Sequence, residues 1–247
     1  MAKIDSNKLV LHGVGEAVLL DQNGKASATL MKLQNMTIEI TSETEDVYGG
    51  DSLFPFFNYV TSKSNTFTFT NAVFDMNVLA ATQGAEVLGG GEAFGSEEVV
   101  VGSEANQLSV TAGIQTDSVI CIADGVNLEA DKFTCTEAGV LTFTEGVQAG
   151  TKVHVSYVYT TTDGSTVHVH TDDVAGYVEL RHTSNPTELP DGTLVQLHTR
   201  VYKARCEGGL NIEYTRDGAV APEVSFKSVD PERADKKFVS YSLVPVK

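Results

Sequence analysis

The sequence predicts a mainly β protein, an antiparallel β-sandwich or barrel with one short α-helix at about residues 71–83. Three observations predict this class. Polar and apolar residues alternate along many short segments, turn dipeptides such as Asp163-Gly164 and Asp191-Gly192 separate those segments, and only one stretch has helical spacing. We take the elements in order.

The two clearest strands lie at residues 35–41 and 66–70, where polar and apolar residues alternate strictly. This pattern is typical of an antiparallel sheet with one face on a core and the other in water. The core-facing positions are Met36, Ile38, Ile40, Phe67 and Phe69. The water-facing positions are Asn35, Thr37, Glu39, Thr41, Thr66, Thr68 and Thr70. Similar alternation predicts strands at 152–159, 166–170, 193–202, 222–227 and 238–244.

The predicted helix follows the second of these strands directly. Asn71 is a favourable N-cap, and Phe74 and Val78 share one helix face four residues apart. Gly84 is expected to end the helix, because glycine readily adopts the left-handed conformation found there. Residues 230–233 predict one further helical turn, with proline at its first position.

A long loop is predicted at residues 43–65, because a plain hairpin between the two clearest strands needs only two to five residues. The loop carries the residues Tyr48, Gly49, Gly50, Asp51, Leu53, Phe54, Pro55, Phe56 and Phe57. Clustered aromatic residues in a long loop either contact a partner or fold back on the core of their own domain. The sequence leaves both alternatives open.

The chain is expected to form a single domain over 1–247 with a β-rich excursion at about 85–150. Gly89-Gly90-Gly91 is expected to be a flexible junction at the start of this excursion. Within it, short strands are predicted at 97–101, 107–112, 118–123, 132–136 and 140–143.

The composition excludes several classes of protein. The chain has 247 residues, 17 Lys and Arg against 33 Asp and Glu, and a formal net charge of −16. Residues 33–131 hold 15 acids and one base, Lys63. Such a chain disfavours nucleic-acid binding, since an acidic surface repels phosphate. No apolar run is long enough for a membrane helix or a secretory signal, and three cysteines without CxxC spacing predict buried, reduced thiols.

No catalytic or metal-binding motif stands out. The nearest candidate is His168 and His170 with Asp172 and Asp173, together with His154 on another predicted strand. A metal site needs three or four converging ligands, so a solvated polar strand face is the favoured interpretation. The nucleophile elbow, Walker A, HExxH and GxGxxG motifs do not occur. We therefore expect no enzyme activity, no cofactor and no metal.

The order of these features resembles the bacteriophage major tail tube proteins, a family similar to type VI secretion tubes. The likeness runs through Met36-Thr37-Ile38-Glu39-Ile40, continues through Tyr48-Gly49-Gly50-Asp51-Ser52-Leu53-Phe54-Pro55, and ends with Phe67-Thr68-Phe69-Thr70-Asn71-Ala72 leading into the helix. It is most specific over about residues 30–85. The segment 99–159 is also similar to β segments of phage tail proteins.

The resemblance implies a ring-forming, tail-tube-like fold. Six copies would form a ring through a shared β-barrel, and rings would stack into a hollow tube through which DNA passes. By this likeness Asn35, Thr37, Glu39, Thr41, Thr66, Thr68 and Thr70 would face the lumen, and residues 43–65 would contact the adjacent ring. The implied partners are further copies of the chain, the tape measure protein, the tail terminator, and tail-tip or baseplate proteins. The implied location is the virion tail, after synthesis in the cytoplasm of the bacterial host, with no membrane binding.

Two other functions are considered. The chain could be a different β-rich virion protein, such as a head decoration protein or an adhesin domain, which would not stack. It could also be a hydrolase with a dispersed site, although the motif templates for hydrolases fail one after another. Ring-forming oligomers would distinguish the tube subunit from the decoration protein.

Overall fold

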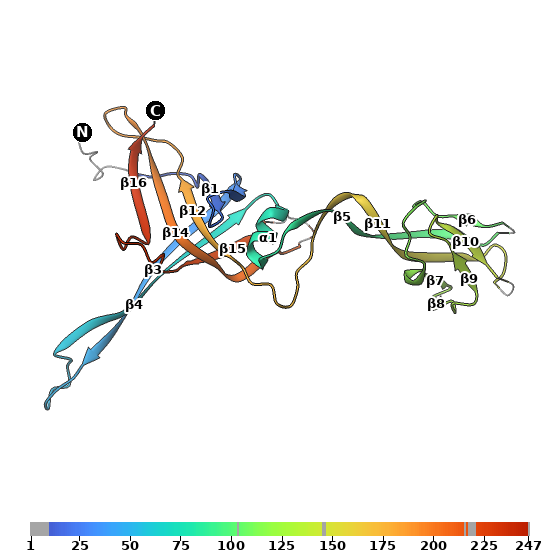
Figure 1. The fold of residues 1–247 in the computed structure, drawn as a ribbon, viewed down its shortest axis with the longest axis horizontal. Helices are drawn as coiled ribbons and strands as arrows, with labels where there is room; N and C mark the ends of the chain where they lie inside the picture. Colours follow the sequence, from blue (N-terminus) through green and yellow to red (C-terminus); the bar gives the residue numbers. More distant parts are fainter. Residues whose placement is uncertain (1–9, 103, 145–146, 215, 217–220, 247) are drawn as a thin grey trace. The chain divides into compact units, whose positions relative to one another are not determined.

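A computed structural model of the chain describes residues 10–102, 104–144, 147–214, 216 and 221–246 (Figure 1). Its contacts separate into two compact units. The first takes in the chain up to Glu86 and from Val167 onward, and the second is Val87–Thr166. Strands dominate both units, which confirms the mainly β class. The expected excursion at about 85–150 lies in the second unit, which extends further because the long strand β11 belongs to it.

The strand pairs with an assigned register are antiparallel. The first unit contains β1 (Glu16–Leu20), β2 (Ala26–Leu30), β3 (Leu33–Val47), β4 (Phe57–Asn71), α1 (Met76–Gln83), β12 (Tyr177–Thr183), β13 (Thr187–Glu188), β14 (Leu194–Asn211), β15 (Glu223–Ser228) and β16 (Val239–Pro245). The second contains β5 (Val87–Val100), β6 (Asn106–Gln107), the 3-10 helix η2 (Thr116–Ser118), β7 (Ile120–Ala123), β8 (Val126–Asn127), β9 (Phe133–Cys135), β10 (Val140–Phe143) and β11 (Lys152–Val167).

One nine-stranded sheet organises the first unit, in the order β2-β1-β12-β14-β15-β4-β3, with β13 and β16 also paired to β14. The sheet does not close into a barrel, so of the two predicted architectures, sandwich and barrel, the sandwich fits. Its apolar faces enclose one core, because strands with one wet face must bury the other. The fully buried members include Leu19, Leu30, Phe67, Phe69, Leu180, Val201 and Phe226.

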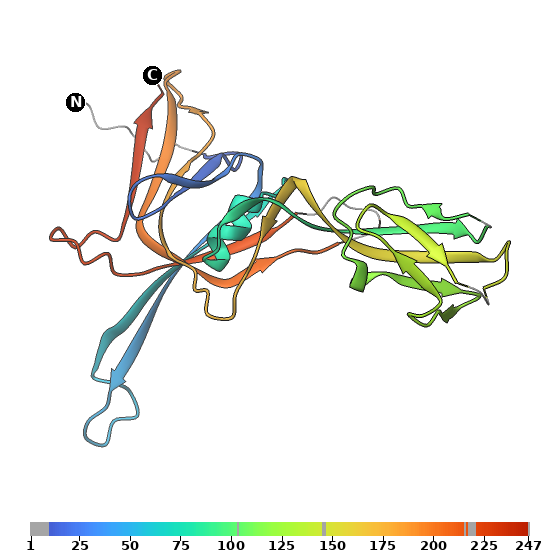
Figure 2. The same ribbon diagram turned by 45° about the vertical axis from the view of Figure 1, so that its right-hand side comes forward.

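The second unit has its own core between two sheets, ordered β5-β11-β7-β8 and β6-β10-β9. These strands, coloured green to yellow, form two layers in Figure 2. Cys121 is fully buried in this core and Cys135 is partly buried. Burial raises the pKa of the Cys121 thiol to about 12, so the group stays protonated near neutral pH. All three cysteines are free thiols, as predicted, but the predicted burial holds only for Cys121, since Cys135 and Cys206 are partly exposed.

The N-cap of the helix lies four residues later than predicted. Asn71 ends β4 instead of capping the helix, and its buried amide donates a hydrogen bond to the carbonyl oxygen of Val73 at 2.7 Å. The N-cap is Asp75, whose backbone is extended and whose carboxylate accepts a hydrogen bond from the backbone N–H of Asn77 at 2.8 Å. The predicted end is confirmed, since Gly84 is the C-cap with φ of 78°.

We expect Gly84→Ala to lower the free energy of unfolding by about 2 kcal/mol or more. A Cβ at this position would carry left-handed strain and would also collide with the carbonyl oxygen of Val174. Gly24→Ala is the matched control, because Gly24 has φ of 79° with nothing within 4 Å of the added carbon, and strain alone should cost about 1 kcal/mol. Urea unfolding of both variants checks the difference. Equal losses would show that the contact with Val174 is unimportant.

Several predicted strands are confirmed. Each of the following predicted segments lies within an observed strand or extends at most two residues beyond it: 35–41, 66–70, 152–159, 193–202, 222–227, 238–244, 118–123, 132–136 and 140–143. The segment 97–101 is the end of β5, while only Asn106–Gln107 of the 107–112 region is in a strand. The turn at Asp191-Gly192 is also present.

Other predicted elements are wrong. Residues 168–170 lie outside any strand, and 230–233 form no helical turn. Gly89-Gly90-Gly91 is part of β5, and Asp163-Gly164 is part of β11. Gly90 allows the backbones of β5 and β11 to lie close together, because a Cβ on Gly90 would be only 2.7 Å from the carbonyl oxygen of Thr161. Thr166 Oγ1 also donates a hydrogen bond to the Gly90 carbonyl oxygen at 2.6 Å.

A buried histidine ties the segment before β1 to the sheet. His182 lies on the core side of β12, and its Nε2 donates to the carbonyl oxygen of Val14 at 2.6 Å. Burial lowers the pKa of His182 below its ordinary 6.5, which outweighs the opposing effect of the hydrogen bond to Val14.

We expect the protein to lose stability as the pH falls below about 6.5, in part through His182. The unfolded chain binds a proton at this histidine more readily than the folded chain, so acid favours unfolding down to the lowered pKa, and above 6.5 the effect vanishes. Urea unfolding at pH 7.5 and 5.5 measures it. His182→Gln should show a smaller difference between the two pH values, and an unchanged difference would contradict the assignment.

Candidate assembly surface

The predicted loop at 43–65 is mostly strand. β3 and β4 pair from Leu33 with Asn71 to Val47 with Phe57, with one register shift after Leu33 and one after Glu43, so only residues 48–56 connect them. β15 pairs with β4 only at residues 66–70, and beyond this point the hairpin has no further strand beside it among the described residues. We call residues 42–63 the arm, which extends from the sheet in blue and cyan in Figure 1. The loop prediction was wrong because both faces of the arm are exposed, which removes the apolar alternation.

Polar cross-strand contacts hold the arm together. Three side-chain hydrogen bonds cross the hairpin: Asn58 to Asp46 at 2.6 Å, Tyr59 to Glu45 at 2.8 Å, and Ser62 to Glu43 at 2.8 Å. The hydrogen bond to the Glu45 carboxylate raises the pKa of Tyr59 above its usual range. Such pairs directly across a ladder are the usual source of stability in a sheet without a core.

The arm tip is apolar and exposed to solvent. Leu53 is 91% exposed, Phe54 79% and Phe56 72%, and Tyr48 and Phe57 are also exposed. The alternative in which residues 53–57 fold back on the core of their own domain is therefore wrong. The tip still has an ordered backbone, because the Phe56 N–H donates to the carbonyl oxygen of Val47 at 3.0 Å. A cluster of exposed aromatic side chains of this kind marks an interaction surface.

A polar face runs along the other half of the hairpin. The exposed members are Asn35, Thr37, Glu39 and Thr41 on β3, while Thr66, Thr68 and Thr70 on β4 are partly buried. Thr68 Oγ1 lies 2.8 Å from Ser225 Oγ, which joins this face to β15. The structure thus brings these seven residues together on two paired strands.

The sequence reasoning missed the basic residues on the same face. Thr66 is opposite Lys227 on β15, and Lys227 is opposite Arg205 on β14. Lys227 pairs with Glu207 at 3.1 Å. The sequence does contain a signal for this base, because the alternation at 222–227 places Lys227 on the side of the strand that faces water. The face is therefore mixed in charge around Glu39, and not uniformly acidic.

A second charged cluster lies further along the sheet. Glu179 on β12 accepts two hydrogen bonds from Arg200, at 2.8 and 2.9 Å, and one from Arg181 at 2.6 Å. Burial alone would raise the pKa of Glu179, but the hydrogen bonds from the two guanidinium groups hold it below its usual range. These ion pairs hold the side chains of Glu179, Arg181 and Arg200 in place, which favours a structural role for the cluster.

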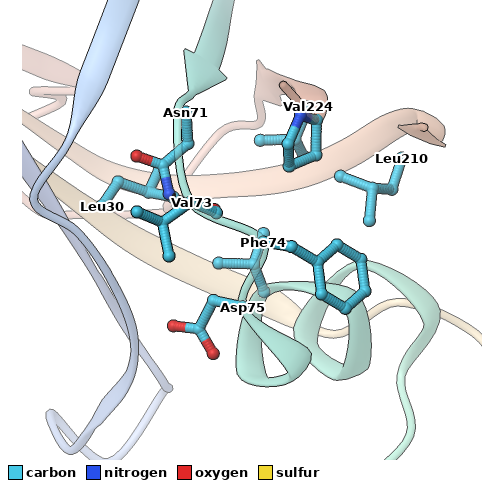
Figure 3. Close-up of a pocket in the computed structure, with 9 residues that line it drawn as sticks. Leu30, Asn71, Val73, Phe74, Asp75, Leu210 and Val224 are labelled. Carbon is cyan, nitrogen blue, oxygen red and sulfur yellow. Dashed lines mark hydrogen bonds between the residues drawn. The ribbon is translucent and has the colours of Figure 1, made fainter. Parts of the chain in front are cut away.

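A small apolar pocket lies beside α1 in the first unit. Figure 3 shows the apolar pocket at the start of α1, between Leu30, Val73, Phe74 and Leu210, whose volume of about 10 Å³ is enough for one water molecule. The Oδ1 atom of Asn71, at this pocket, has no hydrogen-bond partner among the described residues. No group of three or more possible ligands could hold a metal within the described part of the chain.

The histidines of the metal candidate do not share a strand. β11 ends at Val167, and His168 and His170 lie in the irregular segment after it, where the His170 N–H donates to Asp173 Oδ2 at 2.7 Å. His154 is in the second unit, within hydrogen-bond distance of Ser96.

Comparison with known proteins identifies the family. Residues 9–242 match the YomU/Tube protein family. The chain belongs to this family. The expected membership of a phage tail tube family is thereby confirmed. A search of the curated proteins found no match. The YomU/Tube match spans both units, so the second unit lies inside the region that the family match covers.

No described helix of this YomU/Tube chain has the length and apolar character of a membrane span. The arm and the polar face both lie on the β3–β4 hairpin.

Glu39→Lys should leave the free energy of unfolding within about 0.5 kcal/mol of the parent protein, because Glu39 is exposed and makes no ion pair among the described residues. Urea unfolding measures the change, with Thr37→Lys as a neighbouring control. A loss of several kcal/mol would mean that Glu39 is buried in the working protein and would remove it from the polar face.

Proposed function

We propose that this chain is the structural subunit of a phage tail tube. Copies assemble into rings of six, and the rings stack into a hollow conduit for DNA. The observation that carries the proposal is the arm, whose exposed aromatic tip stands clear of its own core. Membership of the YomU/Tube family supports the same role.

The arm is proposed to contact the adjacent ring. Phe54, Phe56 and Leu53 would lose their exposure to water in such a contact, and burying one large apolar side chain is worth about 1.5–3 kcal/mol. Glu43, Glu45 and Asp46 keep the stem of the arm hydrated before assembly. The arm therefore combines an apolar tip, which can bind another copy, with a charged stem that stays in contact with water.

The polar face is proposed to line the lumen. Hydroxyl and amide side chains hydrogen-bond to water and offer DNA no apolar surface. Glu39, the acidic member of the face, repels phosphate, and the nearby Lys227 is ion-paired with Glu207. DNA would thus pass as non-specific cargo without adhering to the wall.

The chain would act in the virion tail, as a structural protein and not as an enzyme. Its main partner is another copy of itself. The tape measure, the tail terminator and the tail-tip or baseplate proteins are the further partners that a tube requires, and no membrane partner is proposed. Synthesis would take place in the cytoplasm of the bacterial host.

Negative-stain electron microscopy of the purified protein, together with its mass in solution, tests this function. Hollow rings or striated tubes are expected, either spontaneously or on a tail-tip seed. A chain that stays monomeric even on such a seed would contradict the tube role and favour a head decoration or adhesin role.

A further inference from the structure

The four-stranded sheet of the second unit, β5-β11-β7-β8, has an outer face that carries apolar side chains. Cys121 on β7 lies opposite Val155 on β11, and both are fully buried on the core side. Because side chains alternate along a strand, the neighbouring pair of Ile120 with Ser156 lies on the outer face. Ile120 is 50% exposed. Such a face of an antiparallel sheet normally carries polar residues, so an isoleucine there is unusual.

β5 adds an aromatic ring to the same outer face. Val99 is buried on the core side of this strand, and Gly95 lies on that side against the ring of Tyr157, with which an added Cβ would collide. Phe94 directly precedes Gly95 and therefore points to the outer face. Its side chain is 82% exposed.

The apolar side chains lie next to one another across three strands. Two contacts join β5 to β11 on the outer face, namely Ser96 Oγ with His154 Nε2 at 2.9 Å and Glu98 with Lys152 at 2.7 Å. Their register places Phe94 beside Ser156, which lies opposite Ile120 on β7. An exposed apolar patch of this kind marks an interaction surface. We call the following residues the sandwich patch: Phe94, Ser96, Ile120, Ile122, His154 and Ser156.

The unit that carries the sandwich patch is strongly acidic. Residues 87–166 hold eleven acids and two bases. Both bases are in ion pairs, Lys152 with Glu98 at 2.7 Å and Lys132 with Asp131 at 3.9 Å. The unit therefore has a large excess of negative charge and no unpaired lysine or arginine among its described residues.

The acids beside the patch restrict what it can bind. Glu92 is exposed on the same side of β5 as Phe94, and the exposed Asp117 lies in η2 just before β7. Nucleic acids, anionic glycans and anionic membranes are repelled by such surroundings. A second copy of this chain is disfavoured as well, because the rest of the chain holds 22 acids against 15 bases. A basic protein surface is complementary.

We propose that the sandwich patch docks a protein other than this chain, which presents apolar side chains surrounded by lysine and arginine. The apolar side chains of the partner cover Phe94 and Ile120, and its basic side chains pair with the acids at the rim. This inference goes beyond the tube function, since it gives the second unit a task that requires neither rings nor tubes.

Fluorescence anisotropy with the full chain in solution tests the chemistry of the partner. The probe is a labelled synthetic peptide of alternating leucine and lysine, and the matched control peptide has glutamate in place of every lysine. The lysine peptide is expected to bind at low salt and to bind more weakly as the salt concentration rises, because salt screens the charges. Absence of binding by the lysine peptide, or equal binding of the two peptides, would overturn the proposal.

Phe94→Ser locates the binding site, with Val126→Ser as its matched control. Val126 on β8 is 68% exposed but lies opposite Ala123, on the other side of the sheet from the patch. Both variants should keep the parent melting curve, since each replaces an exposed side chain. Phe94→Ser should weaken binding of the lysine peptide at least about tenfold and Val126→Ser should not. Parent affinity in Phe94→Ser would contradict the assignment.

Glu92→Lys and Glu137→Lys separate a local site from attraction to the overall charge. Both variants change the net charge equally, but Glu137 is exposed between β9 and β10, in the other sheet of the unit. Glu92→Lys should weaken binding of the lysine peptide more than Glu137→Lys does. Equal losses would mean that the peptide follows the overall charge, and the sandwich patch would then not be its site.

Discussion

Replacing residues 48–56 with an Asn-Gly turn is expected to abolish the stacking of rings while leaving a folded subunit. The replacement removes Leu53, Phe54 and Phe56, the most exposed apolar side chains of the tip. It retains the last pair of the hairpin, Val47 with Phe57, and an Asn-Gly turn favours the tight loop that such a pair needs. The tip contributes nothing to the core, so the free energy of unfolding should change by less than about 1 kcal/mol.

Microscopy and solution mass of this variant separate the two levels of assembly. Rings without tubes are expected, since the replacement is confined to the tip and leaves the sheet intact. Phe54→Ser alone, as a milder variant, should shift the seed-dependent growth of tubes in the same direction. Tubes of normal length from the tip replacement would show that the arm does not join the rings.

Phe67→Ala is expected to have the largest effect on stability, lowering the free energy of unfolding by about 3–5 kcal/mol. Phe67 is fully buried on β4, where it lies opposite Ile38 on one side and Phe226 on the other. Truncation would leave a cavity in the sheet that carries the arm. A domain of ordinary stability has only about 5–15 kcal/mol in total, so assembly should fail as well.

Phe54→Ala is the matched control for Phe67→Ala, since it removes the same ring from the exposed tip. Its melting temperature should stay at the parent value, and only its assembly should suffer. Urea unfolding and microscopy together check both variants. A small loss of stability in Phe67→Ala would mean that the core described here collapses around the missing ring.

The strands with one wet face could be predicted from sequence because burial on one side imposes a period of two. That physical cause is present at residues 66–70, where Phe67 and Phe69 are buried and the threonines between them are not. It is missing in the arm, where neither face is buried, so the sequence pattern there does not predict strands. The seven polar-face residues could be predicted because they alternate with apolar residues on the core side.

Other elements depended on tertiary contacts that local patterns do not record. β12 was overlooked because its core-side residues include a histidine, His182, which a hydropathy pattern counts as polar. The helix start was misplaced because Asn71 and Asp75 are equally good caps by residue type, and the pairing of β4 with β15 decides between them. Glycines at 89–91 indicated flexibility, although they allow two backbones to approach.

The second unit enters and leaves through strands that lie side by side, with Thr166 hydrogen-bonded to Gly90. The chain therefore departs from the first unit and returns to it at nearly one place. A polypeptide inserted between two adjacent points imposes little strain on its host, so a different domain with close termini can replace Val87–Thr166 without redesign of the tube subunit. The same junction is a place where an engineer can insert a chosen domain.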